Sequence, residues 1–70
     1  MTPTEFREAR RKLGLSAAEM ARAIGVADGR QIRRLEADPA DASHRPVSPT
    51  VALLVSILLR VPAARKIAGI

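Results

Sequence analysis

Four helix-start signals at short intervals constrain the fold of this chain more than any other feature of its sequence. Thr2 and Ser16 each precede a glutamate by three residues, the pattern of a capping box in which a side chain and the backbone exchange hydrogen bonds. Asp28 can cap a third helix, with Gln31 at the reciprocal position, and Ser48 followed by a proline marks a fourth. No segment alternates apolar and polar residues for long enough to form a strand. The sequence therefore predicts an all-α chain of short helices.

Helix-stop signals agree with this division. Gly14 and Gly25 suit the left-handed backbone that often closes a helix, and a proline stops the third helix. The fourth helix is predicted over residues 49–60, and a short fifth can begin at Pro62. We expect a compact bundle of four to five short helices that forms one domain over residues 1–70.

Composition limits the chemistry that such a bundle can carry. The chain has no cysteine and only one histidine, His44, which excludes disulfides and metal sites rich in Cys or His, so no metal or cofactor is expected. Twelve Lys and Arg against seven Asp and Glu give a net charge of +5, which points to DNA, RNA or an anionic membrane as partner. Because Phe6 is the only aromatic residue, base-stacking platforms are missing and duplex DNA is favoured.

Catalytic and membrane roles find little support. The sequence has no glycine-rich phosphate loop and no convincing carboxylate pair, so we expect neither an enzyme nor a small-molecule ligand. The longest apolar stretch, Val51 to Val61, is interrupted by a serine and an arginine and is too short to span a bilayer. With no targeting segment visible, the expectation is a cytoplasmic protein that does not bind membranes.

Residues 16–37 carry the pattern that bears most directly on function. A small residue lies inside the second predicted helix, a glycine lies in the turn after it, and two apolar residues follow on the third helix. These residues are Ala21, Gly25, Ile32 and Leu35. The pattern, over about residues 4 to 60, resembles the lambda-repressor-like (Xre) family of helix-turn-helix DNA-binding proteins of phages and bacteria. The resemblance implies a helix-turn-helix and a sequence-specific, double-stranded-DNA-binding regulator of transcription.

The sequence departs from this family in two places. The family commonly has a glutamine directly after the cap of the second helix, where it contacts a phosphate, and this chain has Ala17 there. The turn between Gly25 and Ile32 is one residue longer than usual, which changes the register of the first base contacts. Gly29 lies in this turn, and its lack of a side chain would allow a close approach to DNA.

Four residues of the third predicted helix are candidates for base contacts. A helix fits the major groove of DNA, and residues near its N-terminus reach the base edges. Because the apolar residues of this helix face the core, Arg30 and Arg34 project from the opposite side, where arginine can pair with guanine. Arg33 borders the same face, and Gln31 could pair with adenine in competition with its capping role. The alternative interpretation of this cluster is an ordinary solvated helix face.

Other polar residues have expected roles around this helix. Candidates for phosphate contacts are Ser16 at the start of the second helix and His44 and Arg45 in the loop after the third. In the family, an arginine late in the first helix pairs with a glutamate near the end of the recognition helix, so the resemblance implies a structural Arg10–Glu36 ion pair. The remaining basic residues that we expect as solvated surface charges include Arg7, Arg11, Arg22, Arg65 and Lys66.

The helix predicted over residues 49–60 is apolar on almost every side, and three short helices cannot cover it completely. It is either a central core helix or, as we favour, a helix whose outer side joins two copies of the chain. Residues 49–70 would then supply the core and dimerisation helices. The expected interface residues are Leu54, Leu58, Val61, Ile67 and Ile70. A homodimer would place two recognition helices about one DNA turn apart on a near-palindromic operator.

Repression by occupancy of that operator is the simplest mechanism, and activation through contact with polymerase stays open. The main alternative is an antitoxin-like interaction module whose apolar C-terminal helix binds a partner protein. Such proteins often bind DNA as well, so the two interpretations overlap. An origin in a phage is suggested by the family resemblance only.

Overall fold

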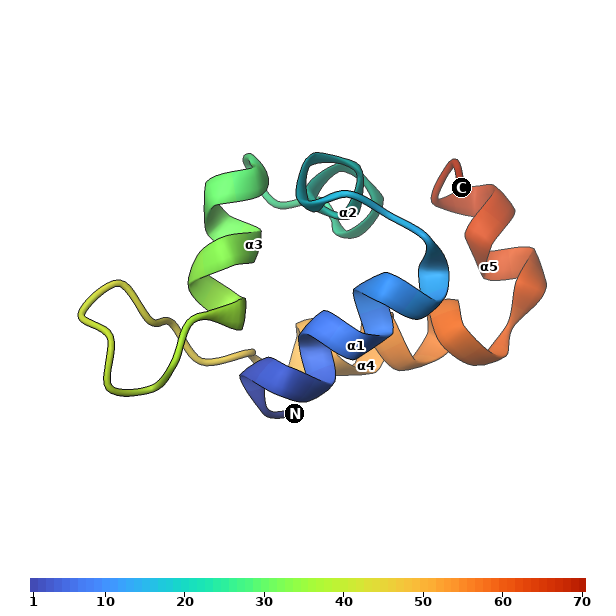
Figure 1. The fold of residues 1–70 in the computed structure, drawn as a ribbon. Helices are drawn as coiled ribbons and strands as arrows, with labels where there is room; N and C mark the ends of the chain where they lie inside the picture. The colour runs from blue at the N-terminus through green and yellow to red at the C-terminus, as the bar shows by residue number, and fades with distance from the viewer.

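The computed structural model describes all of residues 1–70, as five α-helices and no strand (Figure 1). The helices are α1 (Pro3–Leu13), α2 (Ala17–Ile24), α3 (Gly29–Glu36), α4 (Pro49–Arg60) and α5 (Pro62–Ile67). α1 packs against α4, α2 packs against α3, and α3 also contacts α1. Figure 1 shows α3 and the loop that follows it at one end of the molecule and α5 at the other. The predicted all-α architecture of five short helices is confirmed.

Two capping boxes fix the starts of α1 and α2, as the sequence predicted. The Thr2 hydroxyl accepts the N–H of Glu5 at 3.1 Å, and the Glu5 carboxylate accepts the N–H of Thr2 at 2.7 Å. Ser16 and Glu19 exchange the same two bonds at 3.1 and 2.9 Å. The hydroxyl of Ser48 caps α4. These bonds satisfy backbone groups that have no acceptor within the first turn of a helix.

The start of α3 differs from the prediction. Asp28 Oδ1 accepts the N–H groups of Arg30 and Gln31, but the Gln31 side chain makes no return bond to the cap. The reciprocal capping role predicted for Gln31 is therefore wrong. Gln31 instead lines a shallow hollow on the flank of α3 that faces the loop. Leu35 of α3 and Val51 of α4 line the same hollow.

The core consists of eight buried apolar side chains drawn from the first four helices. They are Phe6, Ala9, Met20, Ala21, Ile24, Ile32, Val55 and Leu58. Leu58 is only 1% exposed, so its predicted place in a dimer interface is wrong. It lies three residues after Val55, and this spacing puts both side chains on the buried side of α4. α4 therefore contributes to the core with one side only.

The capping boxes also tie the stability of the fold to pH. Hydrogen bonds donated by the backbone and hydroxyl of Thr2 and Ser16 lower the pKa of Glu5 and Glu19. A folded-state pKa below the unfolded one means that the unfolded chain binds protons more readily. The stability that these carboxylates contribute is therefore present above their unfolded pKa and is lost as the pH falls through the folded value.

We expect the melting temperature to decrease as the pH is lowered from about 5 to about 3, which brackets the ordinary glutamate pKa. The double variant Glu5→Gln/Glu19→Gln keeps two side chains that can accept the same cap bonds but cannot titrate. Its melting temperature should decrease less steeply over the same interval. Thermal unfolding followed by circular dichroism measures both curves, and equal steepness would contradict this assignment.

Candidate nucleic-acid interface

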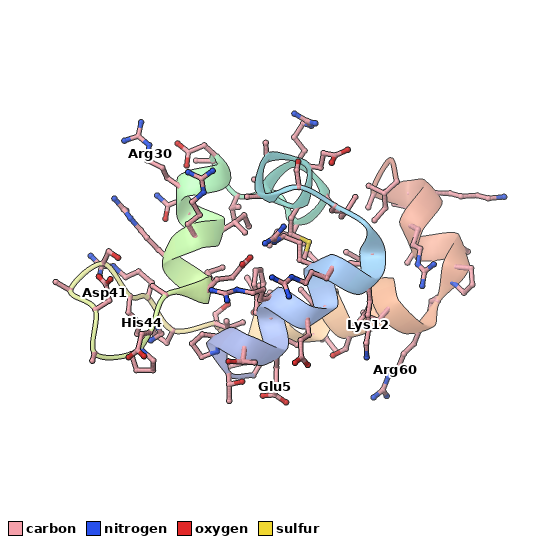
Figure 2. The ribbon with its side chains drawn as sticks, in the orientation of Figure 1. Glu5, Lys12, Arg30, Asp41, His44 and Arg60 are labelled. Carbon is pink, nitrogen blue, oxygen red and sulfur yellow. The ribbon has the colours of Figure 1, made fainter.

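α3 presents an arginine-rich face on the side opposite the core. Ile32 is fully buried and Leu35 partly, whereas Arg30 and Arg33 are exposed and Arg34 is partly exposed. In Figure 2 the Arg30 side chain leaves the start of α3 and extends away from the body of the molecule. None of the three guanidinium groups takes part in an ion pair. Three positive charges are therefore directed to solvent from one short helix.

Gln31 lies beside this arginine face. It is partly exposed and lines the hollow between α3 and the start of α4, as described above. The structure therefore places the four predicted base-contacting residues on one helix but directs Gln31 toward the loop side. Arg30 and Arg34, one turn apart, form the centre of the face.

An ion pair attaches α3 to α1. Arg10 Nε and Nη2 donate to the two carboxylate oxygens of Glu36 at 2.8 and 3.0 Å, and Arg10 Nη1 donates to the carbonyl of Leu15 at 3.1 Å. Glu36 is buried, and its hydrogen bonds raise the pKa of Arg10 above the ordinary value. The structure thus brings together the predicted pair, and Arg10 also holds the turn between α1 and α2.

Arg7 is a second partner of the same carboxylate, and the sequence prediction missed it. Its Nε lies 3.5 Å from Glu36 Oε1, and its Nη2 lies 3.5 Å from the Glu36 carbonyl oxygen. Arg7 precedes Arg10 by three residues, so both side chains leave α1 on the same face. That spacing was the signal in the sequence that Arg7 and Arg10 share one acceptor.

The loop after α3 is bonded back to the end of that helix. α3 ends at Glu36, and the residue that follows, Ala37, is in extended conformation, without a glycine cap. The N–H of Arg45 donates to the Arg34 carbonyl at 3.0 Å, and His44 Nδ1 lies 3.0 Å from the Ala37 carbonyl oxygen. The Arg45 guanidinium donates to the carbonyl of His44 at 2.8 Å. The two loop residues predicted to contact phosphate therefore lie beside the last turn of α3.

Ser16 is less available for a phosphate contact than the sequence suggested. Its hydroxyl already accepts the N–H of Glu19, and the Glu19 carboxylate accepts the N–H of Ser16. A phosphate at the start of α2 would therefore meet a negative charge. The N–H groups of Ala17 and Ala18, which have no intrahelical acceptor, are the remaining donors at this end.

Gly29 serves the contact between α2 and α3. A Cβ atom added to Gly29 would lie 3.3 Å from the backbone nitrogen of Ala18 and 3.5 Å from the Cβ of Ala17. The space that the missing side chain leaves at Gly29 is therefore taken by α2, and the close approach of DNA to this residue stays a prediction. Two small residues, Ala17 and Gly29, let the starts of the two helices approach closely.

The five residues predicted for a dimer interface differ widely in their exposure. Val61 and Ile67 are exposed, Leu54 is partly buried, and Leu58 is in the core as described above. Ile70 lines a small hollow against α2. The exposed apolar residues of α4 are instead Leu53 and Ile57. A helix that is apolar on every side does not show in its sequence which side is buried.

Arg65, expected as a solvated charge, has a structural role. Its Nε donates to the Leu58 carbonyl at 2.7 Å, and its Nη2 donates to the Leu59 carbonyl at 3.0 Å. These carbonyls belong to the last turn of α4, where no intrahelical donor is available. The side chain therefore attaches α5 to the end of α4.

Neither a membrane-spanning helix nor a metal-binding cluster is found in the structure. No helix reaches the length and apolar character that crossing a membrane requires. No group of three or more His, Cys, Asp or Glu side chains is placed to hold a metal ion. Comparisons of the chain with models of protein families, with curated proteins and with solved structures find no match.

Replacing Arg10 by methionine would leave the buried carboxylate of Glu36 with only the 3.5 Å contact of Arg7 Nε. We expect Arg10→Met to reduce the free energy of unfolding by about 2–4 kcal/mol, somewhat less than for a fully buried pair because the Arg10 side chain is 21% exposed. The matched control is Arg11→Met, an exposed neighbour that should change stability by less than about 0.5 kcal/mol. Urea unfolding followed by circular dichroism measures both, and equal effects would refute the role of the pair.

Proposed function

We propose that this chain is a sequence-specific, double-stranded-DNA-binding regulator of transcription, a repressor that acts as a dimer by occupying its operator. The observation that carries the proposal is the arginine face of α3, formed by Arg30, Arg33 and Arg34. Its charges are directed outward because Ile32 and the buried Glu36 hold the opposite side of the helix. Rigid presentation of several arginines on one helix suits a polyanion with a fixed repeat.

The dimensions of α3 support insertion into a major groove. An α-helix with its side chains is about 10–12 Å in diameter, and the groove is about 12 Å wide. Arg30 and Arg34 are four residues apart, so their Cα atoms are separated by about 6 Å along the axis, close to two base-pair steps. Each guanidinium can donate to O6 and N7 of a guanine. We infer a half-site with guanines at two positions within three consecutive base pairs.

α2 and the loop support the same interpretation. α2 packs closely against the start of α3 through Gly29, as expected of the first helix of a helix-turn-helix. The loop residues His44 and Arg45 are bonded to the last turn of α3, so a phosphate that they contact has a fixed position relative to the bases. The net charge of +5 adds long-range attraction to DNA.

A second candidate function is an antitoxin-like interaction module. The observation that favours it is the exposed apolar side of α4, with Leu53 and Ile57 at its surface and Val61 exposed directly after the helix. Contiguous apolar surface of this kind marks sites of protein association. Co-purification of a second protein in stoichiometric amount would favour this candidate over the first.

Selection of bound sequences from a randomised duplex pool, at near-physiological salt, tests the main proposal. Enrichment of a two-fold symmetric motif with guanines in each half-site is the expected result. Retention of DNA without any motif, or no retention at all, would overturn sequence-specific binding. The double variant Arg30→Ala/Arg34→Ala should lose the motif. Arg11→Ala is the matched control and should keep it.

Arg34→Ala should weaken binding to the selected site by about 1–3 kcal/mol, or roughly 5- to 150-fold, and relax the preference at one base position. The cause is the loss of a bidentate arginine–guanine contact. Fluorescence anisotropy with the selected duplex and its single-base variants measures both effects. Unchanged preference at every position would remove Arg34 from the residues that contact bases.

Arg45→Ala should weaken binding to all duplexes alike, because a phosphate contact carries no sequence information. The slope of the logarithm of affinity against the logarithm of salt concentration should decrease by about 0.9 for one lost phosphate contact. Titrations at several salt concentrations, on the selected duplex and on an unrelated one, provide the measurement. A changed base preference would contradict the phosphate role and place Arg45 near the bases.

A further inference from the structure

His44 is the only histidine of the chain, and the structure determines which of its two ring nitrogens carries a proton. Nδ1 lies 3.0 Å from the carbonyl oxygen of Ala37, the residue that follows α3. Because a carbonyl oxygen only accepts hydrogen bonds, Nδ1 is the donor in this contact. The neutral imidazole ring has a single N–H, so its other nitrogen, Nε2, is then unprotonated.

This tautomer decides how the ring meets an anion. An unprotonated Nε2 presents a lone pair and cannot donate a hydrogen bond to a phosphate oxygen. When Nε2 binds a second proton from solvent, the ring becomes an imidazolium with two N–H donors and a positive charge. Nδ1 can then keep its bond to the carbonyl of Ala37 while Nε2–H donates to a phosphate. Such charge-assisted bonds are roughly twice as strong as neutral ones.

His44 lies in the part of the loop that is bonded to the arginine-bearing helix. The next residue, Arg45, donates its N–H to the carbonyl of Arg34 at 3.0 Å, and its guanidinium donates to the carbonyl of His44 at 2.8 Å. Figure 2 shows His44 at the same end of the molecule as Arg30. The ring is partly exposed, and within the chain only its Nδ1 has a hydrogen-bond partner. Nε2 is therefore available to a ligand.

The charged groups around His44 come from its own loop, from the end of α3 and from α1, and the start of α4 carries no charge. They are Asp38, Asp41 and Arg45 in the loop, Arg33, Arg34 and Glu36 in α3, and Arg7 of α1, which contacts Glu36. Hydrogen bonds from Ser43 lower the pKa of Asp41, and the nearby charge of His44 lowers it further. Carboxylates and guanidinium groups ordinarily titrate outside the interval from about pH 5.5 to 7.5, in which histidine side chains gain a proton. His44 is thus the one residue of this region whose type titrates there.

We propose that His44 is a proton-dependent phosphate contact, which holds a phosphate of DNA through Nε2–H in its protonated form and does not hold it in its neutral form. This inference rests on the proposed function and adds its regulation by pH. The affinity for duplex DNA then increases as the pH falls, and binding is accompanied by the uptake of up to one proton at His44. Arg45 keeps its charge throughout and supplies a contact that does not depend on pH.

The tautomer is tested on the chain without DNA. Nuclear magnetic resonance of the ¹⁵N-labelled chain distinguishes the two neutral tautomers by the chemical shifts of the ring nitrogens, and a single histidine makes their assignment direct. At about pH 8 we expect a protonated Nδ1 and an unprotonated Nε2. A neutral ring protonated at Nε2 would overturn the proposal, because that form could donate to a phosphate without binding a second proton.

DNA binding at two pH values tests the contact itself. The probes are the duplex enriched by selection and an unrelated duplex of the same length, at constant ionic strength. We expect both affinities to increase about tenfold from about pH 7.5 to about pH 5.5, because one charge-assisted bond is gained. The salt slope on each duplex should become steeper by about 0.9 at the lower pH. Equal affinities at the two pH values would overturn the proposal.

Two variants separate His44 from other sources of pH dependence. His44→Asn keeps an N–H that can donate to the carbonyl of Ala37 but does not titrate, so its affinities at the two pH values should agree within about twofold. Arg45→Ala should bind more weakly at both pH values and keep the increase toward low pH. Circular dichroism verifies that both variants fold. An increase that persists in His44→Asn, or that is absent in Arg45→Ala, would contradict the role of His44.

The failure of this inference and the failure of the proposed function give different results. Binding of the selected motif with equal affinity at both pH values would refute the proton-dependent contact and leave DNA binding intact. The absence of binding to either duplex at any pH would refute the proposed function and, with it, the contact.

Discussion

The arrangement of α3 depends on one buried carboxylate, that of Glu36. Arg10 contacts both of its oxygens and the carbonyl of Leu15, so one guanidinium joins α1, the turn after it and the end of α3. Burying an ion pair costs desolvation energy that its attraction repays only when the geometry is good and the remaining hydrogen-bonding groups are satisfied. Arg7 provides a further contact to the same residue. Because few apolar residues hold α3, this polar junction determines the direction in which its arginines project.

The two ends of α3 are held by polar contacts as well. Asp28 accepts two N–H groups at the start, and the loop donates the N–H of Arg45 to a carbonyl of the last turn. Gly29 lets α2 approach the first turn. A helix of eight residues would be unstable in isolation, and these contacts replace the packing that a longer helix would have. The proposed binding face is therefore positioned before any ligand arrives, which reduces the entropy lost on binding.

The molecule has two exposed surfaces of opposite character, on helices that do not pack closely on one another. The arginine face of α3 suits a polyanion, and the exposed apolar side of α4, with Leu53 and Ile57, suits an apolar partner. The core is thin, so association of two chains through the apolar surface would stabilise each fold by mass action. The apolar surface would in this way also support the helix that carries the arginine face. In the dimer of the proposed function, DNA with two half-sites would stabilise the same pair of chains that presents the two α3 helices.

The local features were determined by the sequence alone. The caps at Thr2 and Ser16 depend on residues three apart, and the arginine face of α3 follows from helical spacing around Ile32. Tertiary structure decided the long-range contacts and the burial that local spacing does not predict. It placed Arg7 on Glu36, turned Gln31 away from its cap, and buried Leu58 while exposing Ile57. The physical reason is that the sequence of a uniformly apolar helix carries no periodic signal for its buried side, so the orientation of α4 depends on which side packs against α1.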